Sequence, residues 1–237
     1  MKIKRLHDWN VTTAEARDIQ GRLAERITTT PLTKSPKLIA GIDISVSRWH
    51  KAGRAAVVVL DYPSLEPLEI QVAESVISFP YVPGLLSFRE APLAIEACRK
   101  LTCEPDLVIV DAQGIAHPRR LGFASHLGLC LDVPTIGCAK SRLIGSHADV
   151  PNHPGGYAYL YDGDEIIGAS VRTKPGVKPV YVSQGHMIDL TSAIKWVIQC
   201  CKGYRLPQPT RLAHLAANGI LNNAPVNRYI KQDTSEK

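Results

Sequence analysis

Apolar and polar residues recur along this chain with two periods, and the N-terminal part shows the helical one. Thr12 and Glu15 stand three residues apart, the spacing of a capping box at the start of a helix. Apolar residues then recur one turn apart from Ile19 to Ile27. This spacing predicts a helix over residues 13–28.

Residues 38–46 show the period of two that is typical of a strand. Apolar side chains occupy one face of this strand, and the other face carries Gly41, Asp43 and Ser45. Asp43 therefore has small neighbours on its own face, which leaves room for another group beside it. A carboxylate in an apolar strand is costly unless it is paired or bound to a metal, so Asp43 is a candidate functional residue.

The rest of the chain predicts further strands and helices. Strands are expected at 55–60, 68–72, 107–110, 135–139, 157–160, 165–171 and 180–183, and helices at 90–101, 119–131, 190–202 and 210–220. Residues 78–89 lack periodicity and contain two prolines, which predicts an ordered loop. Three antiparallel strands followed by strand–helix units imply a mixed α/β sheet flanked by helices. We expect one domain over 1–222, with its core at 38–220, and a polar tail over 223–237.

Composition excludes several classes of protein. The 237 residues are 45% hydrophobic and 21% charged, which fits one globular domain and excludes a disordered or collagen-like chain. Neither a membrane span nor a secretory signal is expected, because apolar runs are short and no apolar segment follows the charged N-terminus. Six cysteines without a CxxC pair predict free thiols in a reducing cytoplasm. The net charge of +6 suggests a polyanionic partner such as nucleic acid.

Three carboxylates form the first candidate site. Asp43 lies inside an apolar strand, Asp111 ends another, and Glu90 begins a predicted helix. Hard divalent ions such as Mg²⁺ take oxygen ligands of this kind. Structural roles are also open, since Glu90 suits the positive end of a helix dipole and Asp111 suits a turn or N-cap. Their spacing alone does not bring the three together.

A histidine and two arginines form the second candidate site. His117 precedes a proline, which favours an extended loop. Arg119 and Arg120 are expected to open the helix over 119–131, where cations oppose the helix dipole. Contacts with phosphate or carboxylate groups explain the two arginines better than a structural role does, with a solvated basic turn as the alternative.

Three further residues are candidates on their own. Tyr81 lies between Pro80 and Pro83, and on such a stiff loop its ring either inserts into a base stack or packs on its own domain. Lys140 follows a strand, where it either neutralises a phosphate near the carboxylates or caps the sheet. Taken alone, His214 is typical of an ordinary surface histidine.

Together these residues resemble the endonuclease V family of deoxyinosine-specific DNA repair nucleases. The resemblance runs from about Ile39 to His214, most of the chain. The segments that carry it are 41–43, 80–90, 111 with 114–122, 139–141 and 202–207. The second and third are long and family-specific, which excludes a chance match.

The resemblance implies a ribonuclease-H-like fold and a metal-dependent phosphodiester hydrolase. It assigns Asp43, Glu90 and Asp111 to a site for Mg²⁺, with Mn²⁺ as a substitute, and adds Lys140 and His214 as catalytic residues. The implied reaction is hydrolysis of the second phosphodiester bond 3′ to deoxyinosine, leaving 3′-hydroxyl and 5′-phosphate ends. We expect the protein to act as a monomer.

The resemblance also assigns residues to the recognition of DNA. Tyr81 and Pro83 match a loop that separates the strands at the lesion. The region that encloses the displaced base is matched by Gly84, Leu86, Gly114, His117 and Leu143. One departure is Ala112, which stands where the family usually has glycine and could crowd the base pocket.

Two other classes of function remain open at this point. An inosine-specific endoribonuclease would use the same scaffold, with a contact to the 2′-hydroxyl group that the sequence does not reveal. A non-catalytic nucleic-acid-binding module would need neither Asp43 nor Asp111. The complete set of carboxylates argues against this second class.

Overall fold

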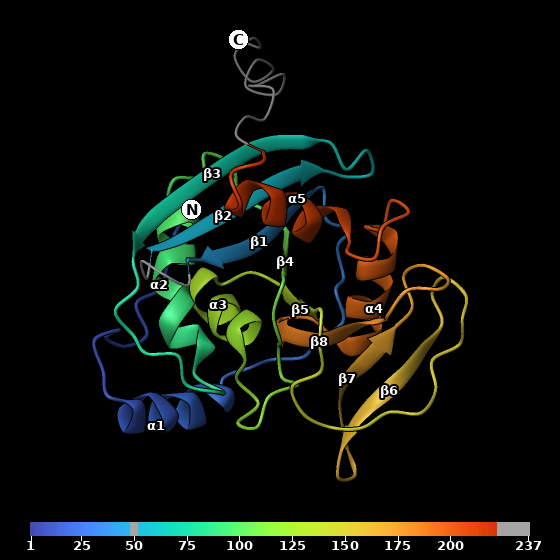
Figure 1. Ribbon diagram of the computed structural model, residues 1–237, viewed down its shortest axis with the longest axis horizontal. Helices are drawn as coiled ribbons and strands as arrows, with labels where there is room; N and C mark the ends of the chain where they lie inside the picture. Colours follow the sequence, from blue (N-terminus) through green and yellow to red (C-terminus); the bar gives the residue numbers. More distant parts are fainter. Residues whose placement is uncertain (48–51, 222–237) are drawn as a thin grey trace.

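The expected succession of strands and helices is present in the computed structural model, which describes residues 1–47 and 52–221 (Figure 1). The helices are α1 (Thr13–Ala24), α2 (Leu86–Arg99), α3 (Phe123–Leu131), α4 (Leu190–Gln199) and α5 (Gln208–Ala217). The strands are β1 (Leu38–Val46), β2 (Ala52–Asp61), β3 (Pro67–Val76), β4 (Leu107–Val110), β5 (Thr135–Ala139), β6 (Tyr157–Asp162), β7 (Glu165–Val171) and β8 (Val180–His186).

The strands form one mixed sheet in the order β3-β2-β1-β4-β5-β8-β7-β6. The first three strands pair antiparallel, β4 and β5 add in parallel beside β1, and the remaining strands return antiparallel. The ribonuclease-H-like, mixed α/β single domain that the sequence predicts is therefore confirmed. The parallel pairing of Ile42 with Val110 sets the functional ends of β1 and β4 side by side.

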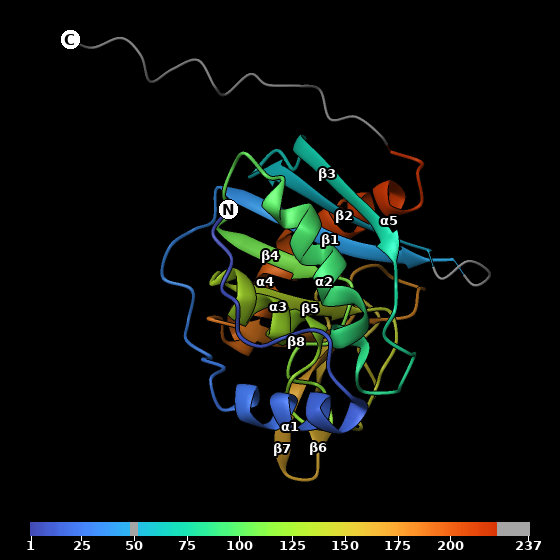
Figure 2. The ribbon, with the colours of Figure 1, turned by 90° about the vertical axis from the view of Figure 1, so that its left-hand side faces the viewer.

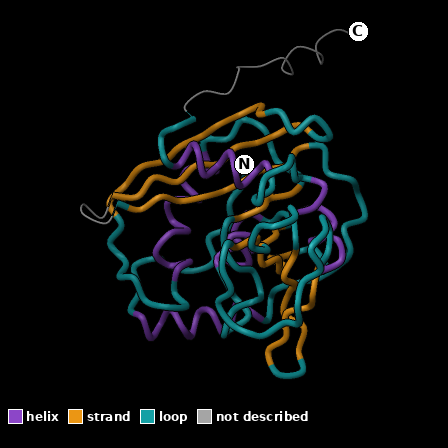
Figure 3. Tube along the Cα trace, turned by 45° about the vertical axis from the view of Figure 1, so that its right-hand side comes forward, coloured by secondary structure: helices purple, strands orange, loops and turns teal. Residues whose placement is uncertain are grey.

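Helices cover both faces of the sheet (Figures 1 and 2). α4 and α5 pack on one face, and α2 and α3 pack on the other. α1 lies outside these layers, where it packs against Phe88 of α2 and the loops beside it. The β6–β7 hairpin projects from the body at the far edge of the sheet (Figure 3).

The alternation predicted for β1 divides its side chains between the two cores. Ala40 and Ile42 belong to the core beneath α2 and α3, whereas Ile39 belongs to the core beneath α5. Gly41 and Asp43 share the α5 side with Ile39 because successive strand residues face opposite ways.

The N-terminal helix has the predicted capping box but is shorter than expected. The Thr12 hydroxyl accepts from the Glu15 amide at 3.3 Å, and the Glu15 carboxylate accepts from the Thr12 amide at 2.7 Å. The helix ends at Ala24 instead of residue 28. After the helix the backbone forms a tighter turn, in which the Arg26 amide donates to the Leu23 carbonyl three residues back. The apolar spacing continues through this turn although the helix has ended.

Two helix starts differ from the prediction for a common reason. α2 begins at Leu86, so the loop predicted over 78–89 is shorter, and α3 begins at Phe123 instead of residue 119. Neither N-cap residue supplies a side-chain hydrogen bond, so the sequence carries no capping signal at these points. Arg120 has a left-handed backbone with φ of 53°, which no residue inside a right-handed helix adopts.

Other expectations are met in part. All six cysteines are free thiols, and four of them are buried. No helix among the described residues is long and apolar enough to cross a membrane. α4 ends at Gln199, before the expected residue 202. The expected tail over 223–237 lies outside the described residues.

Candidate active site

Two carboxylates meet where β1 and β4 run side by side. The Asp111 amide donates to the Ile42 carbonyl at 3.1 Å, which continues the parallel ladder one residue past β4. This register places Asp111 next to Asp43 on the face of the sheet that α5 covers. Both side chains are largely buried, because the exposed fraction of the side chain is 5% for Asp111 and 12% for Asp43.

Helix α5 fills the space that the small residues of β1 leave beside Asp43. A Cβ atom on Gly41 would lie 2.0 Å from the Pro209 carbonyl oxygen, so only glycine permits this approach. The close packing brings His214, about one and a half turns further along α5, to Asp43. Nδ1 of His214 donates to Oδ2 of Asp43 at 2.7 Å. His214 is therefore part of the site and not an isolated surface residue.

The donor atoms of Asp43, Asp111 and His214 suit a divalent cation. One ligand atom from each of the three lies within 4.8 Å of the other two. Oδ2 of Asp111 is buried without a hydrogen bond from any described residue, and its close partner is the Lys140 ammonium group. The two carboxylates are oxygen ligands of the kind that Mg²⁺ and Mn²⁺ prefer, so they fit the metal that the resemblance implies.

Glu90 stands beside this cluster without belonging to it. Burial, together with the negative charge of Asp43, raises the pKa of Glu90 to about 8 against a smaller opposite effect of Arg89. Glu90 is the fifth residue of α2, and the first turn of that helix holds no acidic residue. A role at the helix dipole therefore does not explain Glu90. Burial and the charge of Asp43 also raise the pKa of Asp111, and Lys140 opposes them.

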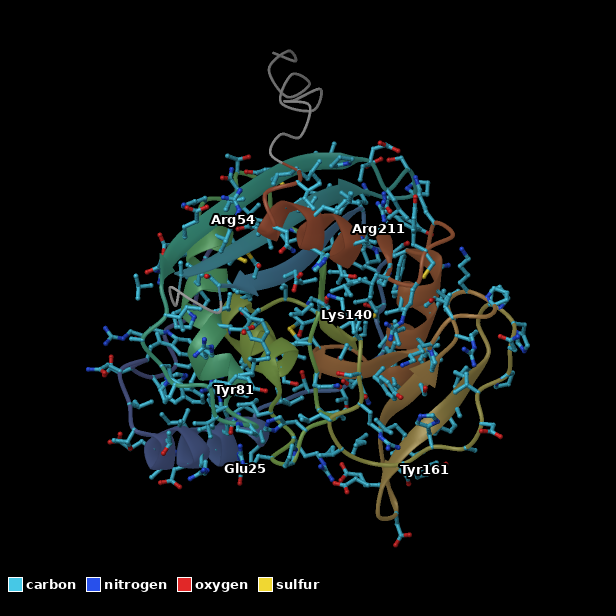
Figure 4. All side chains as sticks on the ribbon, in the orientation of Figure 1. Glu25, Arg54, Tyr81, Lys140, Tyr161 and Arg211 are labelled. Carbon is cyan, nitrogen blue, oxygen red and sulfur yellow. The ribbon has the colours of Figure 1, made fainter. Side chains whose placement is uncertain are left out.

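A cavity of about 400 Å³ opens beside the carboxylates. It is lined by Asp43, Asp111 and Lys140 together with Tyr81, Pro83, Gly84, Leu86, Ala112, His117 and Leu143. The structure thus joins most residues of the expected base pocket to three of the five expected catalytic residues in one cavity, whose lining includes neither Glu90 nor His214. Tyr81 and Lys140 are both labelled in Figure 4. The Tyr81 side chain is 72% exposed, so it does not pack into its own domain.

Gly114 does not line the cavity. Its amide donates to the Ser183 hydroxyl at 2.9 Å, and a Cβ atom at this position would lie 2.0 Å from the Gln184 carbonyl oxygen. Gly114 therefore lets the loop after β4 pack closely against β8, which supports the cavity wall from behind.

The carbonyl oxygen of Gly84 is held by three donors. It accepts from Gln20 at 2.9 Å, from His117 at 3.0 Å and from Arg119 at 2.8 Å. His117 also accepts from the Arg119 amide through Nδ1. Burial and the charge of Arg119 lower the pKa of His117 to about 4, so the neutral ring donates from Nε2. These bonds fix the Tyr81 loop (residues 78–85) at its C-terminal end.

The position expected for Arg119 and Arg120 is wrong. They precede α3 and do not open it, so the argument from the helix dipole does not apply. Arg119 donates to Gln20 and Gly84, and Arg120 pairs with Asp162 and Glu165 of the β6–β7 hairpin. Neither arginine lines the cavity.

Sequence reasoning missed two residues that support the site. Gln20 is fully buried, and it links α1 to the Tyr81 loop through its bond to Gly84. Arg205 donates to the carbonyl oxygens of Lys140, Lys178 and Pro179, which fixes the backbone that carries the Lys140 side chain. The only signal for Gln20 in the sequence was that this polar residue lies on the apolar face of α1. For Arg205 the only signal was its place in the segment 202–207.

Comparison with known proteins identifies relatives over most of the chain. Residues 21–215 match the model of the endonuclease V family. The chain is 49% identical over 221 residues to endonuclease V of Dehalococcoides mccartyi, covering 93% of this chain and 99% of the relative. It is 50% identical over 216 residues to the Gloeobacter violaceus protein of the same name, covering 90% and 88%.

Solved structures agree with this result. The crystal structure of the Bacillus subtilis endonuclease V has a TM-score of 0.88 and 32% identity, with 93% of this chain and 97% of that chain covered. Endonuclease V of Ciona intestinalis, with a TM-score of 0.76 and 29% identity, was solved in complex with a DNA containing an inosine followed by a ribo-adenosine. That comparison covers 88% of this chain and 98% of the other.

Proposed function

Because the chain belongs to the endonuclease V family of nucleases, we propose that it recognises deoxyinosine in DNA and hydrolyses the second phosphodiester bond on its 3′ side. The products are 3′-hydroxyl and 5′-phosphate ends, and the protein acts as a monomer. The observation that carries this proposal is the single cavity that joins the carboxylate cluster to the Tyr81 loop.

Asp43 and Asp111 would hold Mg²⁺, or Mn²⁺ in its place, with Glu90 as the third carboxylate of the site and His214 as a further catalytic residue beside them. A divalent cation supplies charge that polarises the phosphate and lowers the pKa of an attacking water molecule. Asp43 also accepts the 2.7 Å hydrogen bond from Nδ1 of His214, which positions the imidazole beside the two carboxylates.

Lys140 would offset the charge on the phosphoryl oxygens. In the structure its ammonium group pairs with Asp111, and its side chain is 40% exposed. An exposed, flexible ammonium group can turn from the carboxylate to a phosphate without unfolding its surroundings. Arg205 holds the Lys140 backbone during this movement.

One observation concerns whether the substrate of the protein is DNA or RNA. The Ciona intestinalis relative bound a DNA in which a ribonucleotide follows the inosine. An endonuclease acting on inosine-containing RNA is therefore the second candidate function. Cleavage of matched DNA and RNA strands with one inosine each distinguishes the two, and the proposal requires the DNA strand to be the better substrate.

Replacing Tyr81 by alanine should weaken discrimination between inosine-containing and undamaged duplexes by about tenfold. Opening a base step costs a few kcal/mol, least at a weakly paired base. A stacked aromatic ring returns roughly 1–3 kcal/mol per base, which is comparable. The effect should be much smaller on single strands, where no stack has to open.

Cleavage rates of both proteins on single- and double-stranded substrates measure this effect. Tyr161→Ala is the matched control, since Tyr161 is also exposed but lies on the β6–β7 hairpin (Figure 4). Equal losses on single and double strands in Tyr81→Ala would indicate a general binding role and contradict strand separation.

Phosphate binding by Arg119 and Arg120 remains a prediction. Removing one arginine–phosphate interaction should lower the slope of log affinity against log salt by about one. Binding of the double alanine variant to an inosine duplex over a range of salt concentrations measures this slope. An unchanged slope with a lowered unfolding temperature would show that both arginines act only through Gly84 and the β6–β7 hairpin.

Restoring the family's glycine at Ala112 should lower KM for an inosine-containing strand by up to about tenfold, the effect of one methyl group in a tight pocket. Ala112 is 6% exposed and lines the cavity, so its methyl group takes up space there. The value of kcat should not change, because Ala112 contributes no reacting group. An unchanged KM in Ala112→Gly would show that the methyl group does not touch the base.

A further inference from the structure

A chain of hydrogen bonds runs from the N-terminal segment to the wall of the cavity. Nδ1 of His7 lies 2.7 Å from the Asp8 carbonyl oxygen, and Nε2 of His7 lies 2.8 Å from Nε2 of His126. Nδ1 of His126 lies 3.1 Å from the hydroxyl oxygen of Ser87. Ser87 is the second residue of α2 and lines the cavity.

The direction of every bond in this chain follows from its first acceptor. Burial lowers the pKa of His126 to about 3 and also lowers the pKa of His7, so both rings are neutral near pH 7. A carbonyl oxygen only accepts, so Nδ1 of His7 carries the proton and Nε2 of His7 accepts. His126 must then donate from Nε2, which leaves Nδ1 of His126 as an acceptor. The Ser87 hydroxyl therefore donates to His126.

The rings of the chain are held in place by packing. His7 contacts Trp9 and Phe88 with ring centroids 4.4 and 5.2 Å apart, and His126 contacts the same two rings at 5.0 and 5.3 Å. His126 is fully buried, and Ser87 is 2% exposed. These contacts pack both imidazoles into one aromatic cluster, which holds their ring nitrogens in line with the hydrogen-bond partners.

The consequence for the cavity is a change in the chemistry of Ser87. A free serine hydroxyl can rotate and either donate or accept. Here the only proton of the hydroxyl is used by His126, so any further hydrogen bond to this oxygen has to come from a donor. A group placed against Ser87 must bring a hydrogen-bond donor, because a second acceptor there would leave two buried lone pairs facing each other.

We propose that Ser87 is a specificity-determining residue, whose oxygen accepts a hydrogen bond from a ring N–H of the enclosed base, and that His126 and His7 are the positioning residues that hold it in this state. This inference rests on the proposed function and deepens it. Hypoxanthine carries a proton on N1, whereas N1 of adenine is an acceptor. These hydrogen bonds would therefore favour hypoxanthine over adenine, the base from which hypoxanthine arises by deamination.

The proposal is tested by combining a substitution at Ser87 with a modified base in the substrate. The substrates are single strands carrying either hypoxanthine or its 1-deaza analogue, in which C–H replaces N1–H, so that base pairing plays no part. The wild-type protein should prefer hypoxanthine in kcat/KM by about tenfold more than Ser87→Ala does, the effect of one hydrogen bond. Ser87→Thr, which keeps the hydroxyl, should restore the preference.

Substitutions at His7, where the chain of hydrogen bonds begins, give a second test that leaves the residues lining the cavity unchanged. His7→Phe keeps a ring for packing but cannot accept from His126, whereas His7→Gln can. The preference for hypoxanthine should fall in His7→Phe and persist in His7→Gln. The ¹⁵N NMR shifts of His126 should show its proton on Nε2 in the wild-type protein.

The possible outcomes distinguish a failure of the proposed function from a failure of the inference about Ser87. If the wild-type protein cleaves neither strand in Mg²⁺, the proposed function is wrong. If it cleaves the hypoxanthine strand but Ser87→Ala keeps the full preference, or His126 carries its proton on Nδ1, the function stands and the inference about Ser87 is overturned.

Discussion

Asp43→Ala and Asp111→Ala should each reduce cleavage of an inosine-containing duplex in Mg²⁺ by about a thousandfold or more. Each variant loses one ligand atom of the three that lie within 4.8 Å of one another. Metal-assisted charge stabilisation contributes several kcal/mol to such reactions, and about 1.4 kcal/mol corresponds to a factor of ten. Single-turnover cleavage rates measure the loss.

Stability and binding provide the controls for this prediction. Removing one of two neighbouring carboxylates relieves their repulsion, so neither variant should unfold at a lower temperature in metal-free buffer. Both should keep much of their affinity for DNA. Asp164→Ala, an exposed residue at the tip of the β6–β7 hairpin, is the matched control and should cleave normally. Normal cleavage by either Asp43→Ala or Asp111→Ala would refute the assignment.

Gly41→Ala should lower cleavage by about a hundredfold and also destabilise the protein. The added Cβ atom would lie 2.0 Å from the Pro209 carbonyl oxygen, so α5 has to move away from β1. Overpacking of this kind costs about 1–3 kcal/mol of unfolding free energy. α5 carries His214, and displacing a catalytic group by about 1 Å can cost a factor of about a hundred.

Urea unfolding and cleavage rates on the same preparation measure the two effects of Gly41→Ala. Gly21→Ala is the matched control, because a Cβ atom at Gly21 in α1 meets nothing within 4 Å. That control should gain about 0.5–1 kcal/mol, since alanine is favoured over glycine inside a helix. If Gly41→Ala is as stable and as active as the wild-type protein, α5 does not set the position of His214.

Much of the sheet could be predicted from local patterns. The bounds predicted for the strands 38–46, 107–110, 135–139 and 165–171 agree with the structure, since buried strands have continuous or alternating apolar runs that end at polar residues. The starts of α2 and α3 could not be predicted, because Leu85 and Gly122 provide no capping side chain.

The candidate site was predictable in its residue types but not in its assembly. The small residues beside Asp43 indicated that a neighbour would lie there, but they did not identify it. That neighbour is α5, whose His214 stands 171 positions from Asp43 in the sequence, and only the tertiary fold brings the two together. The inward bonds of Arg119 and Arg120 likewise depend on Gly84 and on the β6–β7 hairpin, which no local pattern connects to them.

The support for the Tyr81 loop shows the same limit. Gln20 lies in a helix that local spacing predicted well, but its contact with Gly84 joins residues 64 positions apart. The same holds for His7 and His126, which are 119 positions apart. Residues that act through others in this way leave no mark in the sequence near the site.

Cleavage of an inosine-containing duplex with and without Mg²⁺, beside an otherwise identical duplex with adenosine, tests the central claim most directly. We expect a cut at the second phosphodiester bond 3′ to inosine, only with the metal, and no cut in the adenosine duplex. Cleavage that persists after the metal is chelated, or equal cleavage of both duplexes, would contradict it.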